Sequence, residues 1–526
     1  MIQFKQGIFC FFLFFSIFQL AFSQQEIEKW GRFEIILKHT PVGNAFIDDS
    51  LFAVFSKADK SVKVRGFYDG NGVYKVRFMP DETGIWKYET ISNVSELSKI
   101  TGELLCISPS STNHGPVKVR NIYHFQYSDG SQYFPFGTTS YSFIHQNEKE
   151  VKVAMDCISS SPFNKIRFCV FPQFQDYSEV NPPFFPFERN KNERDTVLWD
   201  YERFNPKFFK NLENRIEELL IRGIEADILI FHPYDEGKWG FDKMNHKTDI
   251  LYLKYLISRL SSYKNVWWSL ANEYDFIKAK SLNDWNSLIA TVASEDSYKH
   301  LCSIHNGKRY FENWNPGLSH ASIQNGALVE DFGRAVILRD AYKKPLIYDE
   351  VCYEGNIIHR WGNLSGEELT FRFWQGLIAG TYITHGETLT GSDSILHLVS
   401  GRELRGKSPA RIGFLRKIVE ESGYLEPADH FWGANQVAVS EKGDIIIYFG
   451  KTRMSKWAFS LPKEIKVPEG TKYTAEIIDT WNMTITPLKD VFETSGTSGS
   501  FIYEKKGKKI KLPNKQYLAI RLKKIN

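Results

Sequence analysis

Apolar residues between positions 120 and 425 form short continuous runs that alternate with segments of helical periodicity. In one such unit, Asn205 can cap a helix, Pro206 suits its first turn, and apolar residues recur at three- and four-residue spacing up to Leu220. The next run, 224–231, is largely apolar and has the length of a strand. Helix-then-buried-strand units repeated over about 300 residues predict a parallel sheet closed into a (β/α)8 TIM barrel.

We expect eight barrel strands, each a short apolar run, and several of them end in polar residues. The fifth and sixth carry the weakest pattern. The expected ranges are 133–137, 164–170, 224–232, 266–273, 302–306, 320–324, 345–350 and 380–387.

The sequence on either side of the barrel has the period-two alternation of strands. Val62 and Val64 alternate with polar residues, and Asp69–Gly70–Asn71–Gly72 supplies turn residues before the next alternating run. We therefore predict an Ig-like β-sandwich over 24–114, the barrel over 115–426 and a C-terminal β-sandwich over 427–526. The fold class is α/β with two all-β flanking domains.

The first 23 residues have the pattern of a signal peptide. Lys5 precedes a Phe-rich apolar run over 8–22, and Ala21 and Ser23 provide small residues before a cut ahead of Gln24. The run is short for a membrane span, and no cysteine follows it to accept a lipid. We expect a secreted or periplasmic protein that is free of the membrane after cleavage.

Composition narrows the range of partners. The net charge of +4 is small for 526 residues, and the one basic block lies at 505–509, which argues against nucleic acid. An aromatic content of 15% favours carbohydrate, because flat apolar rings stack on sugars. The five cysteines outside the signal peptide show no CxxC spacing, so buried free thiols are expected rather than disulfides or a zinc site.

Polar residues at the ends of the expected strands indicate an active site, because such residues meet at one mouth of a barrel. Glu273 closes the fourth strand and Glu350 the seventh, on opposite sides of the ring. One carboxyl group can protonate a leaving oxygen while the other attacks the anomeric carbon, and a separation of about 5–5.5 Å favours retention. This chemistry needs no cofactor. The expected substrate-binding residues are Arg167, His232, Tyr234, Asn272, His305, Gln324, Tyr348, Trp361, His385 and Glu387.

The chain resembles glycoside hydrolase clan A, and within it the apiosidase-like barrels of Bacteroidetes-type polysaccharide-degrading systems. The resemblance lies in Arg167, Asn272–Glu273 and Glu350, and in the stretches 133–139, 384–387 and 408–412. The N-terminal sandwich and residues 479–484 also resemble the accessory domains of such barrels. The resemblance implies that Asn272 contacts the sugar, Glu273 is the acid/base and Glu350 the nucleophile. It predicts a retaining glycosidase acting on an oligosaccharide or polysaccharide.

Several alternatives remain open. Glu236 and Glu387 are further nucleophile candidates, and Trp239 competes with Trp361 as a sugar-stacking platform. His232, His305 and His385 could instead bind a metal, although no HxH pair closes the first strand. A different class of function is a non-catalytic carbohydrate- or matrix-binding protein on a decayed barrel. The sequence leaves the sugar, the linkage and the anomer open.

Overall fold

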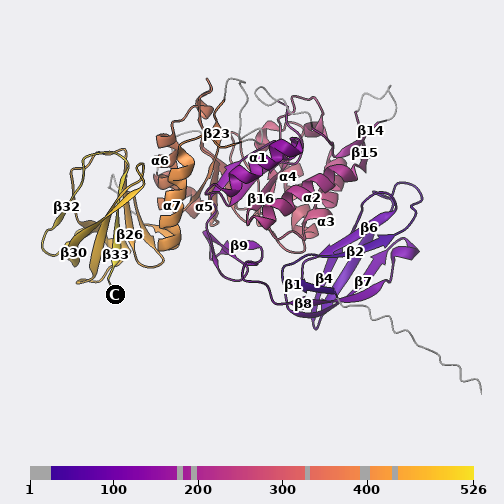
Figure 1. Ribbon diagram of the computed structural model, residues 1–526, viewed down its shortest axis with the longest axis horizontal. Coiled ribbons are helices and arrows are strands. Elements are labelled where there is room, and N and C mark those ends of the chain that lie inside the picture. The colour runs from indigo at the N-terminus through magenta and orange to yellow at the C-terminus, as the bar shows by residue number, and fades with distance from the viewer. Residues whose placement is uncertain are drawn as a thin grey trace, which may run out of the picture.

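The computed structural model describes residues 25–174, 182–190, 198–325, 332–390, 403–428 and 436–525. The predicted signal peptide, 1–23, lies outside the described residues. Figure 1 shows the helix-rich middle of the chain between two sheet-rich regions at opposite ends of the long axis. No helix in the described ranges is long and apolar enough to cross a membrane.

The middle of the chain is a parallel (β/α)8 barrel, as the alternation of helices and buried runs predicts. Its strands neighbour one another in the order β18, β17, β16, β13, β12, β22, β20, β19. A parallel bridge between His305 and Ser322 joins the two ends of this order. The strands are β12 (Gly137–Thr139), β13 (Lys165–Cys169), β16 (Glu225–Phe231), β17 (Val266–Ala271), β18 (Cys302–Ser303), β19 (Ala321–Gln324), β20 (Leu346–Glu350) and β22 (Tyr382–His385).

Helices cover the outside of the barrel, and side-chain caps begin several of them. Asn205 caps α2 with Pro206 in the first turn, as expected, and Ser281 and Asp284 form a capping box on α4. No helix separates β18 from β19 in this fully described part of the chain. The helices are α1 (Glu148–Ser159), α2 (Pro206–Ile221), α3 (His246–Leu260), α4 (Leu282–Glu295), α5 (Phe332–Tyr342), α6 (Gly366–Ile378) and α7 (Ser408–Ser422).

The prediction for the first strand is wrong. Residues 132–133 form β11 (Gln132–Tyr133), which pairs antiparallel with β10 (His124–Tyr127), itself paired with β9 (Val117–Arg120). Pro135 has no backbone N–H to donate to a sheet, so the chain joins the barrel only after it, at β12. The fifth strand is also shorter than expected, with only two residues.

The N-terminal region consists of two facing sheets with an apolar core between them. One sheet has the order β1 (Gln25–Glu28), β8 (Thr101–Ile107), β7 (Gly84–Ser92), β3 (Leu51–Lys57), β4 (Lys60–Arg65). The other has the order β2 (Phe33–Lys38), β6 (Val73–Phe78), β5 (Phe67–Tyr68). Alternate residues of these strands face the core, which accounts for the period-two sequence pattern.

The C-terminal region is also built from strands and packs on α6, where Trp374 stacks on Tyr448 with ring centroids 5.2 Å apart. Its main sheet has the order β24 (Leu425–Pro427), β25 (Gln436–Ser440), β26 (Ile445–Gly450), β33 (Leu518–Lys524), β29 (Lys472–Asp479), β30 (Thr484–Ser498), β31 (Phe501–Glu504), β28 (Ser460–Pro462). A second pair joins β27 (Lys456–Ala458) to β32 (Lys509–Lys511).

Candidate active site

Glu273 lies directly after β17, in an unusual backbone conformation. Its φ of 47° and ψ of 53° are left-handed, which costs an L-residue other than glycine about 1–2 kcal/mol. Tyr234 donates a hydrogen bond of 2.6 Å to its Oε2. Burial, reinforced by the nearby Glu350 carboxylate, raises the pKa of Glu273 to about 7. Glu273 therefore holds a proton near neutral pH and can donate it.

Glu350 ends β20 and has the opposite electrostatic environment. Tyr141 donates a hydrogen bond to its Oε1, and the Asn272 amide donates another of 3.2 Å. His305 Nε2 lies 3.8 Å from the same oxygen and Arg167 Nη1 lies 4.0 Å from it. Burial alone would raise its pKa, but His305, Arg167 and Tyr141 together lower the pKa of Glu350 to about 2. Glu350 is thus an ionised carboxylate.

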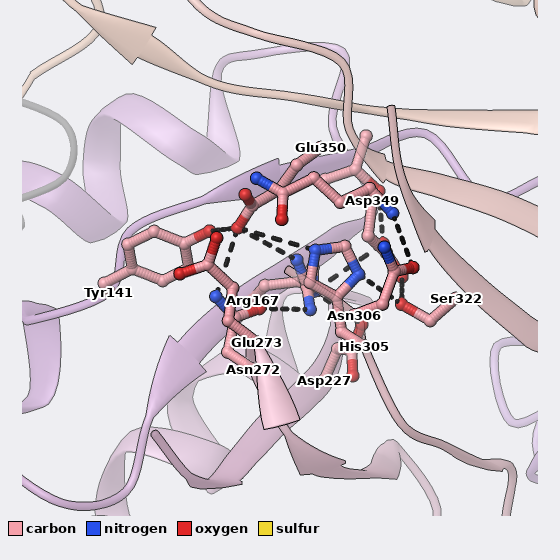
Figure 2. Close-up of polar contacts among 12 residues, drawn as sticks. Tyr141, Arg167, Asp227, Asn272, Glu273, His305, Asn306, Ser322, Asp349 and Glu350 are labelled. Atoms are coloured by element: carbon pink, nitrogen blue, oxygen red, sulfur yellow. Dashed lines mark hydrogen bonds and ion pairs between the residues drawn. The ribbon is translucent and has the colours of Figure 1, made fainter. Parts of the chain in front are cut away.

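The Asn272 side chain links the two carboxyl groups. Its Nδ2 donates to Tyr234 Oη at 2.6 Å as well as to Glu350, and its Oδ1 accepts from Arg167 Nη2 at 3.0 Å. Tyr234 in turn donates to Glu273. Figure 2 shows the carboxyl groups of Glu273 and Glu350 on the same side of Asn272, next to the Tyr141 hydroxyl.

A buried group of ionised side chains lies inside the barrel beneath this site. Lys165 Nζ contacts Asp227 Oδ2 at 2.6 Å and Asp349 Oδ1 at 3.1 Å. Arg167 Nε lies 3.5 Å and 3.6 Å from the same two carboxylates. Ser322 and Thr384 also donate to Asp349, at 2.6 Å and 2.7 Å. Two cations thus balance two carboxylates, and Arg167 is held pointing at Asn272 and Glu350.

An aromatic wall leads from Glu350 towards the surface. The Tyr141 hydroxyl lies 2.9 Å from that of Tyr353, whose ring contacts Trp361 edge-on with centroids 5.9 Å apart. Trp361 is 44% exposed and stacks on His359. An exposed indole at the end of this wall is suited to stack on a sugar ring.

The structure brings together seven of the twelve predicted site residues around one space. Gln324 belongs to this group because it hydrogen-bonds the Glu273 carboxyl group, which opposes part of the pKa rise that burial causes there. Trp361, the twelfth predicted residue, lies outside this group and is connected to Glu350 by the aromatic wall. The seven are Arg167, Tyr234, Asn272, Glu273, His305, Gln324 and Glu350.

Four predicted substrate-binding residues lie elsewhere. His232 hydrogen-bonds the Phe171 carbonyl through Nε2 and accepts the Tyr234 amide through Nδ1, so it orients the Tyr234 backbone. His385 bonds Thr138 and stacks on Phe163, with a ring-centroid distance of 4.7 Å.

Tyr348 is fully buried in an apolar cluster with residues of α6. Glu387 lies on β23 (Glu387–Thr388), paired with β21 (Glu354–Gly355), and accepts the amides of Arg405 and Gly406. Tyr348 and His385 are each next to a residue whose side chain points into the barrel, so their own side chains point to the helical layer.

The positions of the residues argue against two alternatives left open by the sequence: Trp239 as a sugar-stacking platform, and a metal site made of three histidines. Trp239 is only 7% exposed and packs against Phe185, with ring centroids 5.7 Å apart, so it offers no free face for a sugar. His232, His305 and His385 have separate hydrogen-bonding partners and do not converge. Across the described ranges, no group of three His, Cys, Asp or Glu side chains is arranged to hold a metal ion.

The site also contains residues that sequence reasoning missed: Tyr141, Lys165, Asp227, Ser322, Asp349 and Tyr353. Tyr141 follows a strand that was misplaced. The others, apart from Tyr353, are polar residues within barrel strands. Lys165 and Arg167 are two positions apart in a buried strand, and this period of two was a usable signal that the barrel interior is charged.

Comparison with known proteins agrees with this geometry. Residues 120–405 match the family described as "Apiosidase-like, catalytic domain". Residues 26–93 and 432–523 match two domains of unknown function, DUF5060 and DUF5605. No curated protein sequence matches the chain.

The described fold also matches solved structures. A candidate glycoside hydrolase from Bacteroides vulgatus is 38% identical, with a TM-score of 0.92 over 95% of this chain and 100% of that one. A family 5 glycoside hydrolase from the same organism is 14% identical, with a TM-score of 0.58 over 78% of this chain and 93% of that one. The second likeness concerns the fold alone.

Proposed function

Because this chain belongs to the apiosidase-like family of catalytic domains, we propose that it is a retaining glycoside hydrolase with Glu350 as nucleophile and Glu273 as acid/base. The observation that carries the proposal is the opposed ionisation of two neighbouring glutamates. The pKa of Glu273 is raised to about 7 and that of Glu350 is lowered to about 2. A proton donor beside an ionised carboxylate is the pair that double displacement requires.

The proposed reaction has two steps. Glu350 attacks the anomeric carbon while Glu273 gives its proton to the departing oxygen, and a glycosyl ester forms on Glu350. The substituted Glu350 no longer carries a charge, so Glu273 becomes a stronger acid and is left ionised as a base. It then takes a proton from a water molecule as that water attacks the anomeric carbon and the ester bond to Glu350 breaks, so the sugar leaves with its configuration retained and Glu350 is again a carboxylate. A carboxyl separation of about 5–5.5 Å is expected for this course.

We further propose that the substrate is an exported or extracellular oligosaccharide or polysaccharide. The support is the signal-peptide pattern of residues 1–23 and the exposed Trp361 at the end of the aromatic wall. A non-catalytic binding protein would have no need for one protonated and one ionised glutamate side by side, and it would show no turnover on any glycoside.

Replacing each glutamate tests the assigned roles. Glu350→Ala should abolish turnover, and azide should restore some activity and yield a glycosyl azide of inverted configuration. Glu273→Ala should slow cleavage of natural glycosides by about 10²–10⁴-fold. An aryl glycoside with a good leaving group should still give a burst with this variant, followed by slow turnover that azide relieves with retained configuration.

The two variants should therefore differ on activated substrates. Glu387→Gln is the matched control, because Glu387 is also a buried carboxyl group whose pKa burial raises to about 7, yet it accepts hydrogen bonds from the backbone amides of Arg405 and Gly406 and lies away from Glu273 and Glu350. It should retain activity wherever the protein folds. Equal behaviour of the Glu273 and Glu350 variants would show the role assignment to be wrong.

A further inference from the structure

His305 lies beside Glu350, and an imidazole can be neutral or charged according to its surroundings. Its Nε2 faces Glu350 from β20, and its Nδ1 is linked through Ser322 to Asp349 on the same strand. Arg167 and Lys165 from β13 and Asp227 from β16 contact Asp349 or each other, and Glu273, after β17, is another titratable group beside Glu350. Its parallel bridge to Ser322 places the two side chains next to each other, as Figure 2 shows. His305 itself is fully buried.

The hydrogen bonds around His305 Nδ1 determine whether this nitrogen carries a hydrogen. Asp349 contacts two cations, so it is an acceptor only, and its 2.6 Å contact with Ser322 Oγ must contain the hydroxyl proton. Ser322 Oγ has no second proton to give. It can therefore only accept from His305 Nδ1, 3.0 Å away, and Nδ1 carries a hydrogen.

The other ring nitrogen of His305, Nε2, faces Glu350. With Nδ1 protonated, a neutral imidazole would point the lone pair of Nε2 at the Glu350 carboxylate, 3.8 Å away in a buried site. The fixed charges nearby are the two cations Lys165 and Arg167 and the three carboxylates Asp227, Asp349 and Glu350, which leaves the group one positive charge short. Buried charge without a partner is costly.

We infer that His305 is an imidazolium in the resting enzyme, set in that form by the Asp349–Ser322–His305 chain of hydrogen bonds, and that it keeps Glu350 ionised for attack. His305 is thus a positioning residue that acts through Glu350. The inference rests on the proposed role of Glu350. It implies further that glycosyl-ester formation, which removes the carboxylate charge, leaves the His305 Nε2 proton without its counter-charge.

The direct test is ¹⁵N NMR of the full-length chain labelled at histidine, with the His305 signals assigned by their loss in His305→Gln. Both ring nitrogens should carry protons at neutral pH in the wild type, and Nε2 should lose its proton in Glu350→Gln. An unprotonated Nε2 in the resting wild type would overturn the inference. This measurement needs no turnover, so it is independent of whether Glu350 proves to be the nucleophile.

The kinetic test uses the acid limb of kcat/KM on an aryl glycoside. Removing a cation from beside a carboxylate raises its pKa, so His305→Gln should move this limb up by roughly one to three pH units. Ser322→Ala should move it the same way and Ser322→Thr, which keeps the hydroxyl, should not. His320→Gln is the control, because His320 is equally buried and contacts Ser319 instead. An acid limb that stays in place in His305→Gln would contradict the inference.

Discussion

Glu273 and Glu350 are the same residue type, and only their surroundings separate their behaviour. Glu273 accepts hydrogen bonds from Tyr234 and Gln324 and has a neighbouring negative charge. Glu350 also has two donors, but it faces Arg167 and His305 instead of a second carboxylate. Because both are buried, these few contacts outweigh solvent in deciding which of the two keeps a proton.

This difference predicts the pH profile. Since Glu273 must be protonated to act as an acid, kcat/KM should fall as pH rises through about 7. The acid limb, set by Glu350, should lie well below the usual range of a glutamate. The profile of Glu273→Gln on an aryl glycoside with a good leaving group is the check. If its basic limb remains near 7, another group sets that limb.

The sequence predicts which residues belong to the site when they stand at the end of a strand. It predicts this less well for residues in the middle of a strand. Asn272–Glu273 and Glu350 stand at strand ends, where polar residues are visible against an apolar run. Tyr348 and Asp349 are neighbours in one fully buried strand, and nothing in the sequence tells which of them points into the barrel. Hydrogen bonds from Ser322 and Thr384 show that Asp349 does.

At the scale of elements, Asp275 ties the segment after β17 to the loop after β18. Its carboxylate accepts the backbone amides of Gly307, Lys308 and Arg309 at 2.6, 2.8 and 2.9 Å. The Tyr274 amide also bonds the His305 carbonyl. These hydrogen bonds therefore fix the position of Glu273 relative to that of His305.

Asp275→Ala should loosen this loop. It removes the acceptor for three charge-assisted hydrogen bonds, each worth about 1.5–3 kcal/mol. Hydrogen exchange over residues 304–311 should accelerate, and kcat/KM should fall at least about tenfold, which corresponds to about 1.4 kcal/mol. Asp284→Ala is the control, because it removes the α4 capping box and an exposed pair with His246, neither of which involves the loop after β18, and it should leave both measurements unchanged. Unchanged exchange in Asp275→Ala would mean that the loop is held by other contacts.

Most barrel strands were predictable because the spacing of apolar residues along the sequence reflects which positions are buried. Seven of the eight barrel strands lie within the expected ranges, including the less regular fifth and sixth. The first was misplaced because an antiparallel hairpin with the same apolar pattern precedes it, and local sequence does not say which sheet a strand joins. The fifth strand stops early at Ser303, and the chain continues towards the mouth without further strand pairing except at His305.

At the scale of the whole molecule, the chain is a glycoside hydrolase by family and fold, and its N-terminal region is fastened to the barrel by buried ions. Arg77 on β6 contacts Glu213 on α2 at 2.8 Å, and Arg259 on α3 contacts the same carboxylate at 2.6 Å. Figure 1 shows this sheet region beside α2 and α3. Such contacts depend on individual side chains, so the sequence predicted a barrel with sheet-rich regions on either side but not how these regions join.

Glu213→Ala should therefore destabilise both regions by about 3–5 kcal/mol at pH 7, because two arginines lose a buried partner. Burial opposes ionisation of Glu213, yet Arg259 and Arg77 lower its pKa to about 2. An unfolded glutamate titrates near 4.3, so this stabilisation should be complete above that pH and be lost as pH falls towards about 2.

Denaturant unfolding of wild type and variant across this pH range is the measurement. Glu217→Ala, on the same helix, removes a more exposed pair with Arg32 and should cost less than about 1 kcal/mol. An equal loss from the two variants, or a Glu213→Ala loss that does not shrink at low pH, would contradict the assignment.

The left-handed backbone at Glu273 sets a trade-off between stability and activity at this position. The fold pays about 1–2 kcal/mol to hold a non-glycine residue there and more to bury a carboxyl group, and it recovers neither in the free enzyme. Glu273→Gly should therefore melt at a higher temperature than Glu273→Ala, and both should cleave natural glycosides about 10²–10⁴-fold more slowly than the wild type. Selection for stability alone would remove the acid. Its presence is best understood as strain kept for function.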